Sequence, residues 1–230
     1  MRLRRVVHGL IPRRQVAGQP AAIPLTDAFR HHEAPARSSG GLRPSIIEPL
    51  IFAMNVLSKT HFELFGLVQA FALDRTALDA AYRKVQAAVH PDRFSAGTDT
   101  DRRIAMQLAT QANEAYSTLR EPLSRAAYLC MLHGADPQVH SNTSMPGAFL
   151  GMQMDWRERL DEIRATRSLV QLESLRAEVN EHQAGLLSQL AEAIDKIADF
   201  PGAAGLVRQL MFIERFSEDL AMLEDQLAFE

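Results

Sequence analysis

The stretch that decides the fold runs from Thr76 to Phe94 and reads TALDAAYRKVQAAVHPDRF. Its first part predicts an amphipathic helix, because apolar side chains recur at steps of three and four residues. These side chains are Leu78, Ala81, Tyr82, Val85 and Val89. Pro91 ends that helix, since its ring fixes φ and disfavours helical geometry in the residue before it. The stretch therefore predicts a helix followed by a semi-rigid corner that presents the side chains of His90 and Asp92 to solvent.

Further helices are expected on both sides of this corner. Thr76 is predicted to be the N-cap of the helix before it, with Asp79 three residues on as an approximate capping box. A short helix is expected before that, over residues 61–67. After the corner, a helix is expected to start at Asp99 or Thr100, with an apolar stripe at Ile104, Leu108, Ala112, Ala115, Tyr116 and Leu119. Pro122 then opens another helix, which stops at Gly134.

This layout resembles a J-domain, the module that switches on the ATPase of DnaK-type chaperones. The resemblance rests on His-Pro-Asp between two helices, on the run Asn113-Glu-Ala-Tyr-Ser-Thr-Leu, and on an Arg-x-x-Tyr at residues 125–128. It implies a chaperone-binding set consisting of His90, Pro91, Asp92, Arg83, Lys84 and Arg93. The basic members form a small positive patch, which suits an acidic groove on a partner.

Composition limits what else the chain can be. Of its 230 residues, 47% are hydrophobic and 23% are charged, which is ordinary for a globular protein. The single cysteine, Cys130, excludes a disulfide framework or a Cys-rich metal site within the chain. Residues 141–230 carry eight basic and sixteen acidic side chains, which disfavours nucleic acid or an anionic membrane as their partner.

Residues 1–53 differ from the rest of the chain. They hold eight arginines, three acidic residues and six prolines, without sustained periodicity, and we expect them to be disordered. We favour translation starting at Met54, and we expect the protein in the cytoplasm. The alternative is a genuine transit segment, and with it the mitochondrial matrix.

The remainder of the chain predicts an all-α fold with two domains. Residues 56–133 form the first domain, residues 134–146 a polar linker, and residues 147–230 an antiparallel three-helix bundle with helices near 147–165, 168–198 and 201–228. Ser168 is the expected N-cap of the second bundle helix. In the first bundle helix, the predicted core stripe consists of Phe149, Met152, Trp156, Leu160 and Ile163.

Both domains together resemble the HscB family of iron–sulfur cluster co-chaperones. The matching runs include HFELFGL at residues 61–67, LREPLSRAAYL at 119–129, WRERLDEI at 156–163 and LMFIER at 210–215. The resemblance covers about residues 56–230. It implies that the J-domain stimulates an HscA-like chaperone and that the bundle holds an IscU-like scaffold protein and delivers it.

A second ridge in the first bundle helix is the candidate scaffold-binding surface. It steps by four residues beside the core stripe and mixes apolar with acidic side chains. From the resemblance, the implied scaffold-binding residues are Leu150, Met154, Asp155, Glu158, Glu162 and Phe212. We expect Phe212 to be exposed, because it stands off the seam of Leu210 and Ile213. Gly151 departs from the family pattern, which has a larger apolar residue there.

Other interpretations are disfavoured by the residues themselves. A catalytic set of His90, Asp92 and Cys130 is unpromising, because a proline between His and Asp rarely allows a hydrogen-bonded dyad and Cys130 lies in an apolar run. The histidines at 61, 90, 133 and 140 lack metal-ligand spacing, so we predict neither a metal, nor a cofactor, nor enzymatic activity. A general J-protein with other clients, or a helical adaptor with an incidental His-Pro-Asp, remains the alternative.

Overall fold

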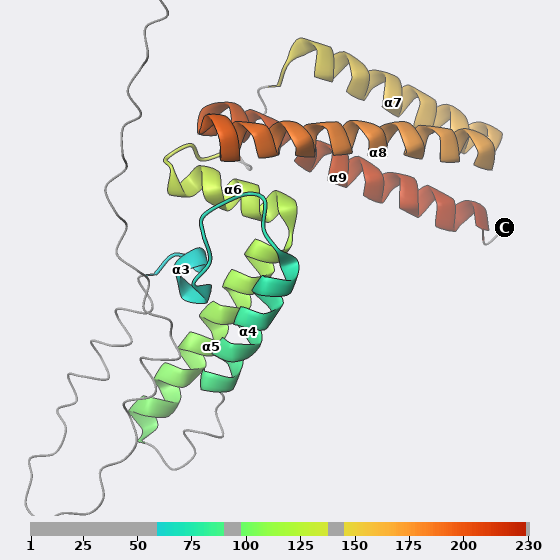
Figure 1. The fold of residues 1–230 in the computed structure, drawn as a ribbon. Coiled ribbons are helices and arrows are strands. Elements are labelled where there is room, and N and C mark those ends of the chain that lie inside the picture. The colour runs from blue at the N-terminus through green and yellow to red at the C-terminus, as the bar shows by residue number, and fades with distance from the viewer. Residues whose placement is uncertain (1–58, 90–97, 138–144, 229–230) are drawn as a thin grey trace, which may run out of the picture.

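The computed structural model describes residues 59–89, 98–137 and 145–228. In these ranges every regular element is a helix, which confirms the all-α class (Figure 1). The helices form two parts, a hairpin with two short partners and a bundle of three long helices. The corner at residues 90–97 and the extension at residues 1–53 lie outside the described ranges.

The first part is built around the hairpin of α4 (Arg75–Val89) and α5 (Asp99–Arg120), with α3 (His61–Phe65) and α6 (Pro122–Leu132) beside it. The rings of Tyr82 and Tyr116 stack across the hairpin with centroids 4.2 Å apart. The hydroxyl of Tyr116 donates a hydrogen bond to Asp79 at 2.8 Å. These contacts hold α4 and α5 in register, while their apolar stripes form the core between them.

Two helix ends in this part differ from the prediction. α4 begins at Arg75, because the carboxylate of Asp74 accepts the backbone N–H of Thr76 at 2.8 Å and acts as the cap. Asp and Thr both cap well, and the predicted cap was placed two residues too late. α3 ends at Phe65 rather than at residue 67, because Gly66 adopts a left-handed conformation with φ of 66°.

The second part is the bundle of α7 (Gly147–Thr166), α8 (Leu169–Glu192) and α9 (Phe200–Ala228). Trp156 is fully buried at its centre. The hydroxyl of Ser168 caps α8 as predicted, accepting the N–H of Gln171. The predicted helix over 168–198 instead changes character near its end, where a π-helical turn, η2 (Ala193–Ile197), follows α8. Ala198, with φ of 58°, ends that turn.

The two parts meet where α6 packs against α9. The ring of His133 stacks on Phe200 at 3.7 Å, nearly parallel. Cys130 is fully buried here, as its apolar neighbours predicted, and its thiol lies 3.7 Å from the carbonyl oxygen of Phe200. Within the described ranges, none of the helices is both long and apolar enough to cross a membrane.

Candidate functional site

The predicted chaperone-binding set is described only in part. Arg83 and Lys84 are exposed on α4, on the side away from its buried residues Val85 and Val89. The other four members, at residues 90–93, lie outside the described ranges. The exposed basic pair is therefore the part of this set whose surroundings the structure gives.

A polar cluster holds this part of α4 in place. The hydroxyl of Tyr82 donates to the side-chain oxygen of Asn113 on α5 at 2.9 Å. The amide of Gln86 donates to the same oxygen and to the hydroxyl of Tyr82. Because Gln86 is less than one turn from the end of α4, this cluster fixes the helix end from which the corner departs. The motif containing Asn113 was recognised in the sequence, but its role in tying the two helices together was not.

The ridge on α7 faces away from the bundle. Leu150 keeps 44% and Met154 keeps 64% of its surface exposed, and the acidic members of the ridge are exposed as well. The neighbouring stripe of α7 turns inward, with Phe149 and Trp156 buried and Met152 half-buried. The bundle therefore uses one face of α7 for its own core and leaves large apolar side chains on the other.

Phe212 is half-buried, so its expected exposure is only partly met. Its ring meets Phe149 edge-on at 5.8 Å and stacks with Phe216 at 6.0 Å. The guanidinium of Arg157, on α7, lies over the same ring at 5.4 Å. α9 thus places Phe212 at the border between the bundle core and the ridge, where one edge of the ring packs inward. Sequence spacing gave no sign of this, because the contact depends on how α7 and α9 pack.

The carboxylates of the ridge differ in whether they form ion pairs. The guanidinium of Arg159 lies 2.7 Å from Glu178 on α8 and 3.4 Å from Asp155, so the charge of Asp155 is shared in a network. The pKa of Glu178 is lowered, first by a hydrogen bond from the indole of Trp156 and then by Arg159. Glu158 and Glu162 form no ion pair with any residue that the structure describes. They are the ridge carboxylates most available to a basic partner.

The described residues offer little for catalysis. Burial raises the pKa of the Cys130 thiol to about 11, so the thiolate that a nucleophile needs is scarce near neutral pH. His61 stacks on Tyr128 at 4.2 Å, and His133 stacks on Phe200. In the parts of the chain that are described, no group of three His, Cys, Asp or Glu side chains could hold a metal ion.

Comparison with known proteins bears on both parts of the fold. The family model of the HSCB C-terminal oligomerisation domain matches residues 145–221. A co-chaperone protein HscB homolog from Burkholderia thailandensis is 48% identical over 171 residues, which cover 74% of this chain and 97% of the relative. The homolog from Burkholderia cenocepacia is 50% identical over the same length and the same shares of both chains.

Solved structures show similarity to the same group of proteins. Chaperone HscB from Vibrio cholerae has 34% sequence identity and a TM-score of 0.63, covering 74% of this chain and 99% of that one. Human co-chaperone protein HscB has 27% identity and a TM-score of 0.66, covering 72% and 82%. Similarity at this level spans the hairpin and the bundle together, so the chain belongs to the HscB family and is a J-type co-chaperone of iron–sulfur cluster biogenesis.

Proposed function

We propose that this co-chaperone stimulates the ATPase of an HscA-like DnaK-type chaperone and delivers an IscU-like scaffold protein to it. The observation that carries the proposal is the ridge on α7, where Leu150 and Met154 stay exposed although the opposite face of the same helix forms the bundle core. Apolar side chains exposed beside carboxylates are typical of a surface that receives a partner.

The division of labour follows the two parts of the fold. We assign chaperone contact to residues 56–133, through residues 90–93 and the exposed basic pair Arg83 and Lys84 on α4. We assign scaffold contact to residues 147–230, with residues 134–146 as the connection. The cytoplasm is the proposed compartment, in keeping with the bacterial relatives.

The side chains of the ridge indicate what kind of partner surface would bind there. Leu150 and Met154 provide apolar anchors, and each anchor of this kind contributes about 1–3 kcal/mol to docking. Glu158 and Glu162, which have no described ion-pair partner, favour a scaffold surface that carries basic side chains beside an apolar patch. Arg157 stands over Phe212 at the edge of the ridge and offers a place for a partner carboxylate.

A single-turnover ATPase assay tests chaperone contact. The cognate HscA-like chaperone is mixed with this protein, with the scaffold, or with both, and the hydrolysis rate is measured. We expect stimulation by the parent protein and its loss in His90→Gln. Full stimulation by His90→Gln would refute the assigned chaperone contact.

A binding titration tests the scaffold contact. The combined change Leu150→Ala and Met154→Ala is expected to weaken scaffold affinity by at least tenfold, which corresponds to about 1.4 kcal/mol. Val170→Ala is a matched control, since Val170 is 77% exposed on α8 and lies outside the ridge. Unchanged affinity in the double variant would refute the ridge as the scaffold site, whereas a parent protein that binds no scaffold would argue for a J-protein that serves other clients.

A further inference from the structure

A carboxylate that belongs to neither docking surface joins the two parts of the fold. The two side-chain oxygens of Asp195 accept hydrogen bonds from consecutive backbone N–H groups, at 2.7 Å from Phe71 and 2.8 Å from Ala72. Phe71 and Ala72 lie in the loop between α3 and α4, more than 120 residues away in the sequence. One side chain of the bundle thereby holds the segment that leads directly into α4.

Asp195 occupies an unusual backbone element. It lies on the π-helical turn Ala193–Ile197, which interrupts the regular end of α8. Such turns occur mostly singly and are frequent at functional positions. The wider turn shifts the side chains that follow it relative to a continuous α-helix. Asp195 is exposed, so it is not required to complete the bundle core.

The Asp195 contact complements the contact between α6 and α9. The packing of α6 on α9 restrains the two parts at one place. The hydrogen bonds of Asp195 join a different pair of segments, the loop before α4 and the turn after α8. Together, the two attachments restrain the orientation of the hairpin on the bundle more than either does alone.

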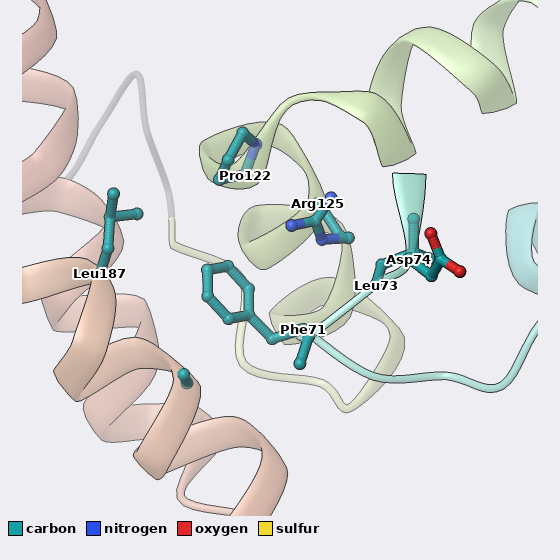
Figure 2. Close-up of a pocket in the computed structure, with 8 residues that line it drawn as sticks. Phe71, Leu73, Asp74, Pro122, Arg125 and Leu187 are labelled. Atoms are coloured by element: carbon teal, nitrogen blue, oxygen red, sulfur yellow. The ribbon is translucent and has the colours of Figure 1, made fainter. Parts of the chain in front are cut away.

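Apolar packing beside this contact is incomplete. An open pocket of about 510 Å³ lies between the two parts, lined on one side by the loop and α6 and on the other by α8 (Figure 2). Phe71 and Pro122 contribute from the first part, and Leu187 and Ala191 from α8. The hydrogen bonds of Asp195 lie beside this open pocket and supply directional contacts between the two parts there.

Arg125 supports the loop from the other side. It is 8% exposed, its guanidinium lies 5.2 Å from the centre of the Phe71 ring, and it donates a hydrogen bond to the carbonyl oxygen of Leu119. Phe71 is therefore held by its ring against Arg125 and by its N–H against Asp195. Attraction between Arg125 and Asp195 also acts across the junction.

We propose that Asp195 is a positioning residue, which fixes the angle between the α4–α5 hairpin and the bundle so that a scaffold held on α7 and a chaperone bound at α4 meet in one geometry. This inference rests on the proposed function and adds to it a residue that touches neither partner. Removing Asp195 leaves both docking surfaces intact and uncouples them.

A distance measurement tests the orientation directly. Spin labels are placed at Met106→Cys on α5 and Val170→Cys on α8, both exposed positions, and pulsed electron paramagnetic resonance gives the distance distribution. The native Cys130 is buried and its pKa is raised to about 11, so it stays unlabelled, which the parent protein checks. We expect a narrow distribution that broadens in Asp195→Ala and broadens less in Asp195→Asn, which keeps one acceptor oxygen. The control Glu192→Gln removes a charge from an exposed residue just before the same turn.

An activity measurement tests the consequence. Asp195→Ala is expected to keep the parent's scaffold affinity and its stimulation of the chaperone without scaffold. The additional stimulation on adding scaffold is expected to fall by about fivefold, within the usual range for coupling between sites. A full scaffold-dependent gain in Asp195→Ala, or an unchanged distance distribution, overturns the positioning role. If the parent itself shows no such gain, the proposed function fails, and the distance measurement still decides whether Asp195 sets the angle.

Discussion

The indole nitrogen of Trp156 donates a hydrogen bond to a carboxylate oxygen of Glu178 at 2.8 Å, while Arg159 holds the other oxygen at 2.7 Å. Trp156 is fully buried, so its one polar atom is satisfied by a carboxylate at the edge of the bundle core. The pair ties α7, which carries the docking ridge, to α8.

Glu178→Gln should therefore have a pH-dependent effect. The pKa of Glu178 is lowered in the folded protein, by the Trp156 hydrogen bond first and Arg159 second. Its charged form stabilises the fold above the ordinary value of 4.5, and this contribution is lost as pH falls through the folded value. We expect Glu178→Gln to lower the free energy of unfolding by about 1 kcal/mol at neutral pH, allowing for the 45% exposed side chain. Urea denaturation down to about pH 3 should show a shrinking difference in unfolding free energy between the variant and the parent. A difference that stays constant with pH would contradict this prediction.

Capping of α4 gives a comparison between two neighbouring residues. Asp74 accepts the N–H of Thr76, and Thr76 itself lies inside the helix. Asp74→Ala should lower the free energy of unfolding by about 1 kcal/mol, the usual cost of losing a cap. Thr76→Ala should change it by less than about 0.5 kcal/mol. The opposite order in thermal or urea denaturation would restore Thr76 as the cap.

Phe212 should respond differently from the exposed members of the ridge. Its ring packs against Phe149 and Phe216, so Phe212→Ala removes core contacts and should cost about 2–3 kcal/mol of stability. Leu150→Ala, at a 44% exposed position, should cost less than about 1 kcal/mol. The stability of each variant should be measured by denaturation beside its scaffold titration. Phe212→Leu provides a milder change than Phe212→Ala. A Phe212→Ala protein as stable as the parent would show that the ring is dispensable for the core.

The ridge carboxylates should contribute unequally to the salt dependence of the scaffold association rate. Glu158 and Glu162 have no ion pair among the described residues, whereas Asp155 already faces Arg159. Glu158→Gln with Glu162→Gln should therefore flatten the dependence of scaffold association rate on ionic strength, and Asp155→Asn should flatten it less. Stopped-flow association at several salt concentrations measures this. An equal effect of Asp155→Asn would mean that its pair with Arg159 opens on binding.

Gly151 offers a test of stability without any change in packing. It lies within α7, and an added Cβ would meet no atom within 4 Å. Gly151→Ala should therefore raise the free energy of unfolding by about 0.5–1 kcal/mol, because alanine loses less backbone entropy in a helix. Gly151→Met would place an apolar side chain beside the ridge residues Leu150 and Met154. Scaffold titration of both variants shows whether the partner tolerates a side chain at this position.

The helices could be predicted because their signals are local. The stripe at Leu78, Val85 and Val89 predicted α4, and the same periodicity with Ser168 as cap predicted α8. The ridge on α7 was also predictable, since burying Phe149 and Trp156 leaves Leu150 and Met154 on another face. Where two good caps compete, as Asp74 and Thr76 do, sequence alone does not decide between them.

Contacts between distant segments could not be predicted. The hydrogen bonds from Phe71 and Ala72 to Asp195 depend on a π-helical turn, which no periodicity indicated. The half-burial of Phe212 and the position of Arg157 over its ring depend on the packing of α7 against α9. The corner at residues 90–93, the strongest signal in the sequence, lies outside the described ranges.

α6 belongs by sequence to the hairpin, yet the face that carries Leu129 and Cys130 is covered in part by α9. A fragment that ends in the linker after Gly134 would expose this apolar face to water and would tend to aggregate. The bundle alone would likewise lose the ring of His133 from above Phe200. Separating the two halves is therefore expected to lower the stability of each, since the seam between α6 and α9 is part of the core of both.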